Sequence, residues 1–230
     1  MSGATDGRGE ILARIGAALG RPPARSPGDP VAVVASVPRT YRGAGAEAGA
    51  ALDLIARFAE RVAEYRAGVT VVAPGEVAGE IARLAGGDGR EVVAAPGLDA
   101  AWLADLPGAV RDDPDSPAPA LDRFAVAVAA SAVAIAETGT IVLDHRPDQG
   151  RRALSLVPDH LVCVVDGRRI VAGVPDAVAA LDPTRPLTWI SGPSATSDIE
   201  LDRVEGVHGP RRLDVVVVVD PPAGRPAAGA

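Results

Sequence analysis

Three short segments of this 230-residue chain carry side chains that are able to bind or transform a ligand. The first reads Ala-Glu-Thr-Gly-Thr and ends at Thr140, with the carboxylate of Glu137 set between two apolar runs. A carboxylate close to the core has a raised pKa unless an arginine or backbone N–H groups compensate for its burial. Glu137 is therefore a candidate nucleophile or general base. Its position alone favours the alternative, a structural acid that caps a turn or pairs with an arginine.

The second segment, SGPSATSDIE, covers residues 191–200 and follows an apolar run at 187–190 that predicts a strand. Glycine allows the backbone to approach a ligand, and a helix beginning near Thr196 or Ser197 would present its N–H groups. Hydroxyls and such N–H groups suit a phosphate or a carboxylate. The alternative is a hydroxyl-rich capped turn that needs no ligand. Asp198 and Glu200 would repel an anion unless they face away or bind a cation.

The third segment, GVHGPR, covers residues 206–211. Glycines on both sides of His208 predict a turn that exposes the imidazole, and Arg211 has the geometry to fork onto a carboxylate. A lone loop histidine is more often an ordinary surface residue. His145 and His160 are weaker candidates, and His160 begins a predicted buried strand, where a structural role is expected.

Together the three segments define one candidate site. Its candidate catalytic residues are Glu137 and His208. The candidate ligand-binding residues are Thr138, Gly139, Thr140, Ser191, Gly192, Pro193, Ser194, Thr196, Ser197, Asp198, Glu200, Gly206, Gly209 and Arg211. No metal ligand is assigned, because no close spacing such as H-E-x-x-H occurs and a site from Glu137, Asp198 and His208 would rest on residue type alone.

Composition excludes several classes of chemistry. All 23 basic residues are arginine, so neither a lysine Schiff base nor a phosphate-binding loop ending in Gly-Lys is possible. The serine-hydrolase pattern G-x-S-x-G and the dinucleotide fingerprint are also missing. The net charge of -7 argues against nucleic acid and anionic membranes as partners. No apolar run approaches the length of a membrane span, and the polar, acidic start does not resemble a secretory signal.

The single cysteine, Cys163, lies in the apolar run 161–165 and is predicted to be a buried strand residue. One cysteine cannot ligate an iron–sulfur cluster alone. A reducing, cytoplasmic location is expected for such a chain. An acidic, proline-rich stretch at 111–120 predicts a surface loop, with metal binding through Asp112, Asp113 and Asp115 as the less favoured alternative.

Strand and helix patterns alternate along the chain, which predicts a single α/β domain with a mostly parallel central sheet and helices on both faces. A helical arm with a proline-rich linker is expected at 1–30, the domain at 31–220 and a disordered tail at 221–230. The arm is either a docking element for a partner or a helix packed on its own domain. Helices are predicted at 10–19, 47–66, 76–84 and 175–181, with helical turns at 98–103 and 151–156. Strands are predicted at 69–73, 91–95, 160–165 and 213–219, with a strand or extended crossing at 31–41. The stretch 124–143 is interpreted as two strands, the second broken at Glu137, and 169–172 as a hairpin return.

The segments AETGT, SGPSATSDIE and GVHGPR together resemble the lactate-utilisation protein C family, which carries the LUD domain, over residues 48–219. The resemblance implies a fold like that of sugar-phosphate isomerases and CoA transferases. In CoA transferases, a glutamate after an inner strand can attack an acyl thioester. It also implies membership of a three-protein system that oxidises L-lactate to pyruvate. In that family cysteine-rich partner proteins hold the iron–sulfur clusters, so no cofactor is expected in this chain.

Three functions of different kinds remain open from the sequence. The chain is a subunit that assembles with the cysteine-rich partners and binds a small carboxylate or phosphate. Alternatively, it is a stand-alone enzyme of the CoA-transferase or sugar-phosphate-isomerase kind that uses Glu137. Thirdly, it is a sensor of small acids whose arm at 1–30 signals to a partner.

Overall fold

The computed structural model describes residues 7–20, 51–86, 91–196, 204–205 and 208–220. Contacts along the chain divide it into two units, Met1–Tyr41 and Arg42–Ala230. The predicted strand or crossing at 31–41 and the predicted tail at 221–230 lie outside the described residues. Across the described ranges, no helix is both long and apolar enough to pass through a lipid bilayer.

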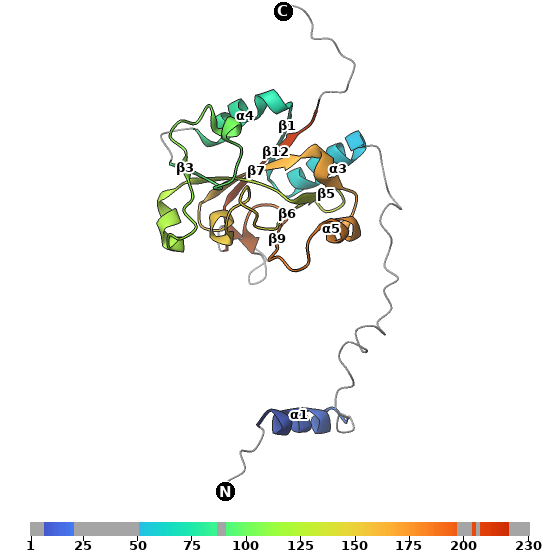
Figure 1. Ribbon diagram of the computed structural model, residues 1–230. Coiled ribbons are helices and arrows are strands. Elements are labelled where there is room, and N and C mark those ends of the chain that lie inside the picture. Colours follow the sequence, from blue (N-terminus) through green and yellow to red (C-terminus); the bar gives the residue numbers. More distant parts are fainter. Residues whose placement is uncertain (1–6, 21–50, 87–90, 197–203, 206–207, 221–230) are drawn as a thin grey trace, which may run out of the picture. The chain divides into compact units, whose positions relative to one another are not determined.

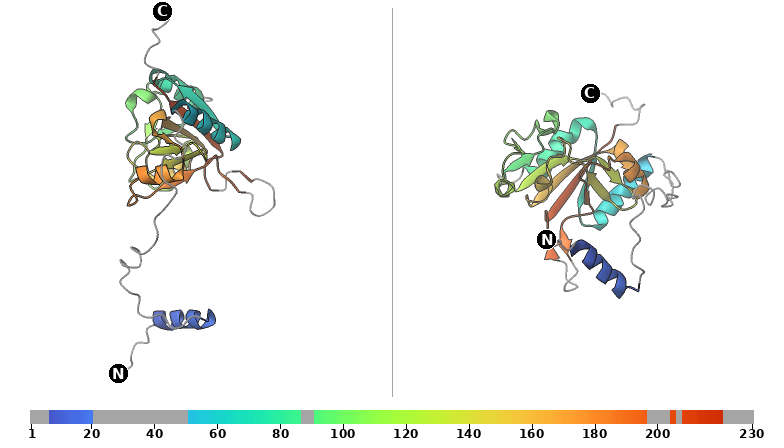
Figure 2. Two further views of the ribbon diagram at one scale, coloured as in Figure 1. Left: turned by 90° about the vertical axis from the view of Figure 1, so that its right-hand side faces the viewer. Right: turned by 60° about the horizontal axis from the view of Figure 1, so that its bottom comes forward.

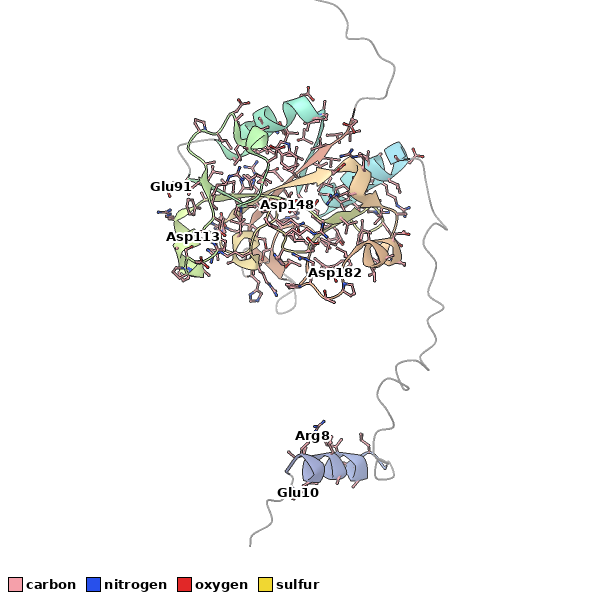
Figure 3. All side chains as sticks on the ribbon, viewed as in Figure 1. Arg8, Glu10, Glu91, Asp113, Asp148 and Asp182 are labelled. Atoms are coloured by element: carbon pink, nitrogen blue, oxygen red, sulfur yellow. The ribbon has the colours of Figure 1, made fainter. Side chains whose placement is uncertain are left out.

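Within the first unit, α1 spans Gly7–Ala18 and confirms the helix predicted in the arm. Its apolar side chains at Ile11, Leu12 and Ile15 are exposed, so none of them contributes to a core within its own unit. Arg14 pairs with Glu10 one turn away, on the helix drawn with its side chains in Figure 3. Such exposed pairs add little stability.

The second unit is built on a six-stranded sheet in which every pairing is parallel. In spatial order its strands are β1 (Gly68–Val72), β12 (Arg212–Val218), β7 (His160–Asp166), β4 (Val126–Ala130), β2 (Val92–Ala94) and β3 (Val110–Arg111). The valine-rich β12 lies between β1 and β7 and is buried on both faces from Leu213 to Val217. This confirms the parallel sheet that the continuous apolar runs predicted.

A second, mixed sheet covers one face of the parallel sheet (Figure 1). Its strands in order are β8 (Ile170–Val171), β5 (Val133–Ile135), β6 (Thr140–Leu143) and β9 (Thr188–Ile190). Ala134 and Ile141 point into the main core, whereas Val133, Ile135 and Val142 pack on the far side. Because strand side chains alternate between faces, this sheet is buried on both sides.

Among the described residues of the second unit, the helices are α3 (Ala51–Glu64), α4 (Val77–Ala85) and α5 (Val174–Ala180). Helix α4 packs on β12 and β7, α3 contacts β1 and β8, and α5 covers the outer face of β5. Figures 1 and 2 place α4 and the mixed sheet on opposite sides of the parallel strands. The 3-10 turns span Pro74–Glu76, Ala100–Leu103, Ala118–Arg123, Arg152–Ser155 and Gly167–Arg169. The expected arrangement of helices on both faces is thus replaced, on one face, largely by a sheet.

Two local predictions are wrong. The chain after Asp166 does not return beside β7 as a hairpin, because a 3-10 turn capped by the Asp166 carboxylate carries it into the other sheet. There β8 pairs with β5 in parallel. A helix does not begin at Thr196 either: β10 (Ala195–Thr196) pairs antiparallel with β11 (Val204–Glu205). Ser197, the other proposed start, lies outside the described residues.

His160 is buried, as expected, and its Nε2 lies 2.7 Å from Oδ2 of Asp214 on the neighbouring strand. Its Nδ1 has no hydrogen-bond partner among the described residues, so the histidine is only half satisfied. Burial raises the pKa of Asp214, but the hydrogen bond from His160 and the charge of Arg212 lower it more, and the net pKa lies below the usual value. The pair therefore favours an ionised carboxylate at the amino-terminal edge of the sheet.

Candidate functional site

The second and third predicted segments form the walls of one cavity of about 300 Å³. Residues after β9 and before β12 face each other across it, and Arg152, Ser155 and Leu156 close a third side. Leu161 and Leu213 form its floor, and because they are the second residues of β7 and β12, the cavity lies at the amino-terminal ends of these strands. Among the described residues, the lining is Arg152, Ser155, Leu156, Leu161, Thr188, Trp189, Ile190, Ser191, Gly192, Pro193, Ser194, His208, Gly209, Pro210 and Leu213.

Hydrogen bonds fasten the two loops to each other. The N–H of Ser194 donates to the carbonyl of Pro210 at 2.8 Å, and the N–H of His208 donates to the Ser194 hydroxyl at 3.1 Å. Gly192 has a φ of +83°, and a Cβ there would lie 2.5 Å from Cβ of Tyr65. Only glycine therefore fits at this turn, which explains why the strand ends in Ser-Gly-Pro.

The first segment joins the second through a chain of hydroxyls. Thr138 Oγ1 lies 2.7 Å from Thr140 Oγ1, which lies 2.8 Å from the hydroxyl of Ser191. Gly139 between them has a φ of +60° and lies against the backbone of α3, where a Cβ would come within 2.8 Å of the Arg61 carbonyl carbon. The first segment thus contacts the cavity wall at Ser191 without lining the cavity itself.

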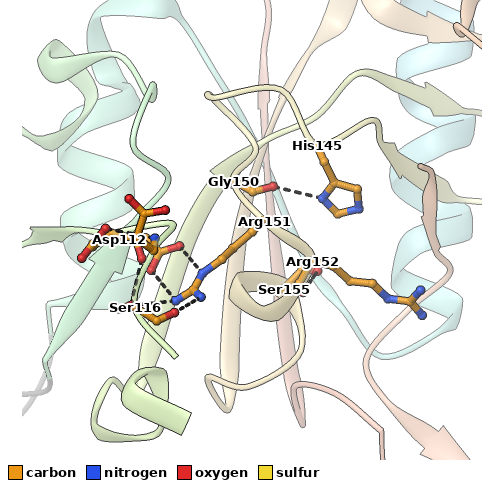
Figure 4. Close-up of polar contacts among 9 residues, drawn as sticks. Asp112, Ser116, His145, Gly150, Arg151, Arg152 and Ser155 are labelled. Atoms are coloured by element: carbon orange, nitrogen blue, oxygen red, sulfur yellow. Dashed lines mark hydrogen bonds and ion pairs between the residues drawn. The ribbon is translucent and has the colours of Figure 1, made fainter. Parts of the chain in front are cut away.

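Arg152 supplies the positive charge of the cavity. Its side chain is exposed, and across the described ranges its guanidinium makes no hydrogen bond or ion pair. The adjacent Arg151 points the other way and forks onto the buried carboxylate of Asp112, with donor–acceptor distances of 2.8 and 3.0 Å (Figure 4). Of these two consecutive arginines, Arg151 therefore anchors the turn to Asp112, whereas Arg152 faces solvent and the cavity.

The cavity as described therefore presents a guanidinium, an imidazole and hydroxyl groups around an apolar floor. Arg152 is able to form two parallel hydrogen bonds to a planar anion. The imidazole of His208 has no hydrogen-bond partner within the described part of the chain. This combination suits a small carboxylate, and the Ser194 hydroxyl, which accepts from the N–H of His208, keeps its own hydrogen for an oxygen atom of such a ligand.

Comparisons with known proteins show the family to which this fold belongs. A model of the LUD domain matches residues 120–218. "Lactate utilization protein C" of Deinococcus radiodurans is 50% identical over 170 residues, which cover 72% of this chain and 80% of that protein. The chain belongs to the lactate utilization protein C family. The described residues that line the cavity all fall inside the matched LUD domain.

Two further relatives show how far the family likeness extends. The protein of the same name from Geobacillus kaustophilus is 33% identical over 109 residues, covering 44% of this chain and 45% of that protein. A crystal structure of a DUF162 family protein from Deinococcus radiodurans superimposes with a TM-score of 0.64 at 41% identity, covering 75% of this chain and all of that chain. The fold and the family are therefore established over most of the second unit.

Glu137 does not lie close to the core, where the sequence predicted a candidate catalytic carboxylate. Its side chain is exposed, it does not line the cavity, and a Cβ on Gly173 would lie 3.1 Å from its Oε2. Gly173 precedes α5, whose first turn carries a partial positive charge that favours a nearby carboxylate. This position matches the structural alternative, an acid beside the start of a helix.

The remaining predicted residues divide into four groups. Ser191, Gly192, Pro193, Ser194, His208 and Gly209 line the cavity. Thr138, Gly139, Thr140 and Arg211 do not, and Arg211 pairs with Asp159 at 2.6 Å. Thr196 lies in β10, and only its backbone is described. Ser197, Asp198, Glu200 and Gly206 lie outside the described residues.

Neither metal alternative gains support from the described residues. Among them, no group of three or more His, Cys, Asp or Glu side chains is placed to hold a metal ion. Asp112 is occupied by Arg151, whereas Asp113, labelled in Figure 3, is exposed. Asp198 lies outside the description, so its combination with Glu137 and His208 stays untested.

Cys163 is buried in the centre of β7, which confirms the sequence prediction. Burial raises the pKa of its thiol to about 12. Such a thiol is protonated at neutral pH and is a poor nucleophile or metal ligand.

Sequence reasoning missed Arg152, Ser155, Thr188 and Trp189 as cavity residues. The helical turn predicted at 151–156 was correct and becomes the 3-10 turn Arg152–Ser155. The paired arginines at its start were the available signal, because two adjacent guanidiniums on one turn must point in different directions. Which of them would face the cavity depended on Asp112, 39 residues earlier in the chain.

Proposed function

We propose that this protein is the cluster-free component of a lactate-oxidation system and that it binds a small carboxylate in the cavity at Arg152. Family membership supports the link to lactate utilisation. The ligand proposal rests on one observation. Residues 191–194 and 208–210 line the same cavity as Arg152, whose guanidinium has no partner among the described residues. Carboxylates of the size of lactate and pyruvate fit a cavity of about 300 Å³.

The electron-transfer part of the reaction falls, in this proposal, to cysteine-rich partner proteins that hold iron–sulfur clusters. The chain's own single cysteine is buried and its thiol is held protonated, so it is unsuited to ligating a cluster. The protein then acts in the reducing cytoplasm as the subunit that receives or positions the acid. The cavity offers hydrogen-bond donors for a carboxylate, which is the group shared by lactate and pyruvate.

Calorimetric titration of the full chain with L-lactate and with pyruvate tests the ligand proposal, with inorganic phosphate as a second anion. Arg152→Gln keeps a polar side chain but shortens it and removes its charge and fork, and it should weaken lactate binding at least tenfold. The matched control is Arg83→Gln, because Arg83 is also an exposed arginine, pairs with Glu80 and does not line this cavity. Equal affinity in Arg152→Gln and the unaltered protein would refute the proposed site.

Affinity purification from lactate-grown cells tests the assembly proposal separately. The tagged protein should retain cysteine-rich iron–sulfur proteins, whose clusters are visible by their absorbance. Retention of such proteins only after growth without lactate, or of none at all, would contradict a role as a subunit of that system.

A further inference from the structure

A second cavity of about 540 Å³ adjoins the first and differs from it in chemistry. Four prolines and a leucine dominate its wall: Pro96, Pro114, Pro147, Pro186 and Leu187. Pro96 and Pro114 follow the carboxyl ends of β2 and β3, which end at Ala94 and Arg111. The carboxyl ends of parallel strands are the usual place for ligands in open α/β sheets.

The second cavity, the apolar chamber, is bounded on one side by the loop between β6 and the turn at Arg152. Backbone hydrogen bonds hold this loop in place. The N–H of Gly97 donates to the carbonyl of Pro147 at 2.7 Å, and the N–H of Ala130 donates to the carbonyl of Asp148 at 2.9 Å. His145 has a φ of +55°, which is unfavourable for a residue with a side chain. Such strain persists only where the surroundings fix it, and it concentrates at functional sites.

Both ring nitrogens of His145 are engaged, and they connect the two chambers. Nδ1 lies 3.0 Å from the carbonyl of Gly150, and Nε2 lies 2.8 Å from the hydroxyl of Thr188. His145 lines the apolar chamber, whereas Thr188 lines the polar cavity. The His145–Thr188 hydrogen bond is therefore part of the wall between them, and Arg152 lines both.

The charges of the other arginines in the apolar chamber are already matched. Arg146 pairs with the buried Asp144 at 2.9 Å, and Arg151 pairs with Asp112 at 2.8 Å. Within the described part of the chain, this leaves Arg152 at the junction as the arginine available to an incoming anion. An acid held there has the polar cavity on one side and a proline-rich apolar wall on the other.

We infer that the site is built for an amphipathic monocarboxylic acid, with its carboxylate on Arg152 and an aliphatic chain of several carbons in the proline-lined chamber. The inference rests on the proposed carboxylate site and names its ligand class. Lactate carries a single methyl group, which leaves a chamber of about 540 Å³ unfilled. Burial of each further methylene group strengthens binding, because apolar surface leaves water.

Titration of the full chain with L-lactate, butyrate and hexanoate tests this inference. The dissociation constant should fall about threefold to fourfold for each methylene group added between butyrate and hexanoate. Pro186→Glu places a carboxylate on the exposed wall of the apolar chamber. It should weaken hexanoate binding at least tenfold and leave lactate binding within about twofold, as expected for a charge that meets only the longer chain.

The matched control is Val178→Glu, which adds the same charge at an exposed apolar position on α5 that lines neither chamber. It should leave all three affinities unchanged, and loss of hexanoate binding there would overturn the inference. Equal affinity for butyrate and hexanoate, or an unaltered hexanoate affinity in Pro186→Glu, would overturn it and leave the carboxylate site intact. If no acid binds in an Arg152-dependent way, the proposed function fails, and this inference with it.

Discussion

The ion pair between Arg151 and Asp112 provides a sharp test of how the site is held in place. Asp112 follows β3 and is only 5% exposed, and its two carboxylate oxygens accept from Nε and Nη2 of Arg151. The same guanidinium donates to the carbonyl and the hydroxyl of Ser116. Arg151→Met keeps much of the apolar stem but leaves a buried carboxylate and a carbonyl without their donor.

Removing one partner of a buried ion pair costs about 3–5 kcal/mol, because the remaining charge is left uncompensated in the interior. Domains of this size have a total free energy of unfolding of about 5–15 kcal/mol. For a domain of 150–250 residues, each kcal/mol lowers the melting temperature by roughly 2–4 °C. Arg151→Met should therefore lower the melting temperature by on the order of 10 °C.

Urea unfolding followed by circular dichroism measures this loss, provided that the slope of the unfolding free energy against urea concentration is the same in all variants. The double variant Asp112→Leu/Arg151→Met should be more stable than Arg151→Met alone, because no unpaired charge is then buried. The matched control is Arg168→Met, since Arg168 forks onto Asp166 with similar distances but is 78% exposed. Surface pairs contribute little, so this control should unfold almost like the unaltered protein.

Two results would refute the reasoning. If Arg151→Met unfolds at the same urea concentration as Arg168→Met, the buried pair does not hold the turn. If the double variant is no more stable than Arg151→Met alone, the loss does not come from an unpaired buried charge.

Three further predictions concern other parts of the second unit. The pKa of Asp214 is lowered in the folded state, so its ionisation stabilises the fold above the pKa of the unfolded state, about 4, and this stability is lost as the pH falls below it. Asp214→Asn should therefore flatten the acid limb of a curve of unfolding free energy against pH, and an unchanged limb would contradict this. Gly139→Ala should cost at least about 1–3 kcal/mol of unfolding free energy, because of its positive φ and the nearby α3 backbone, whereas Gly75→Ala, with open space around it, should cost far less. Cys163 should resist alkylation at pH 8 until the protein is unfolded, and fast labelling of the native protein would show that the strand opens.

The amino-acid sequence determined the parallel sheet and most of its helices. Valine runs such as β12 have no polar alternation, and only burial on both faces accommodates them. The amphipathic pattern of α3 and the buried position of Cys163 follow from the same local rule. The family segments also identified one wall of the cavity, since Ser191 to Ser194 follow the end of β9 and His208 precedes the start of β12.

Only the tertiary structure decided which side chains share the cavity. Arg152 faces it because Asp112 draws the neighbouring Arg151 away, and nothing in the local sequence links residues 39 positions apart. Glu137 has the residue type of a catalytic acid, yet the β5–β6 turn directs it toward Gly173. The mixed sheet likewise depends on β8 pairing with β5 in parallel, a long-range contact. Local patterns fix which face of a strand or helix is apolar, whereas the direction of a polar side chain depends on distant partners that only the folded chain brings within hydrogen-bonding distance.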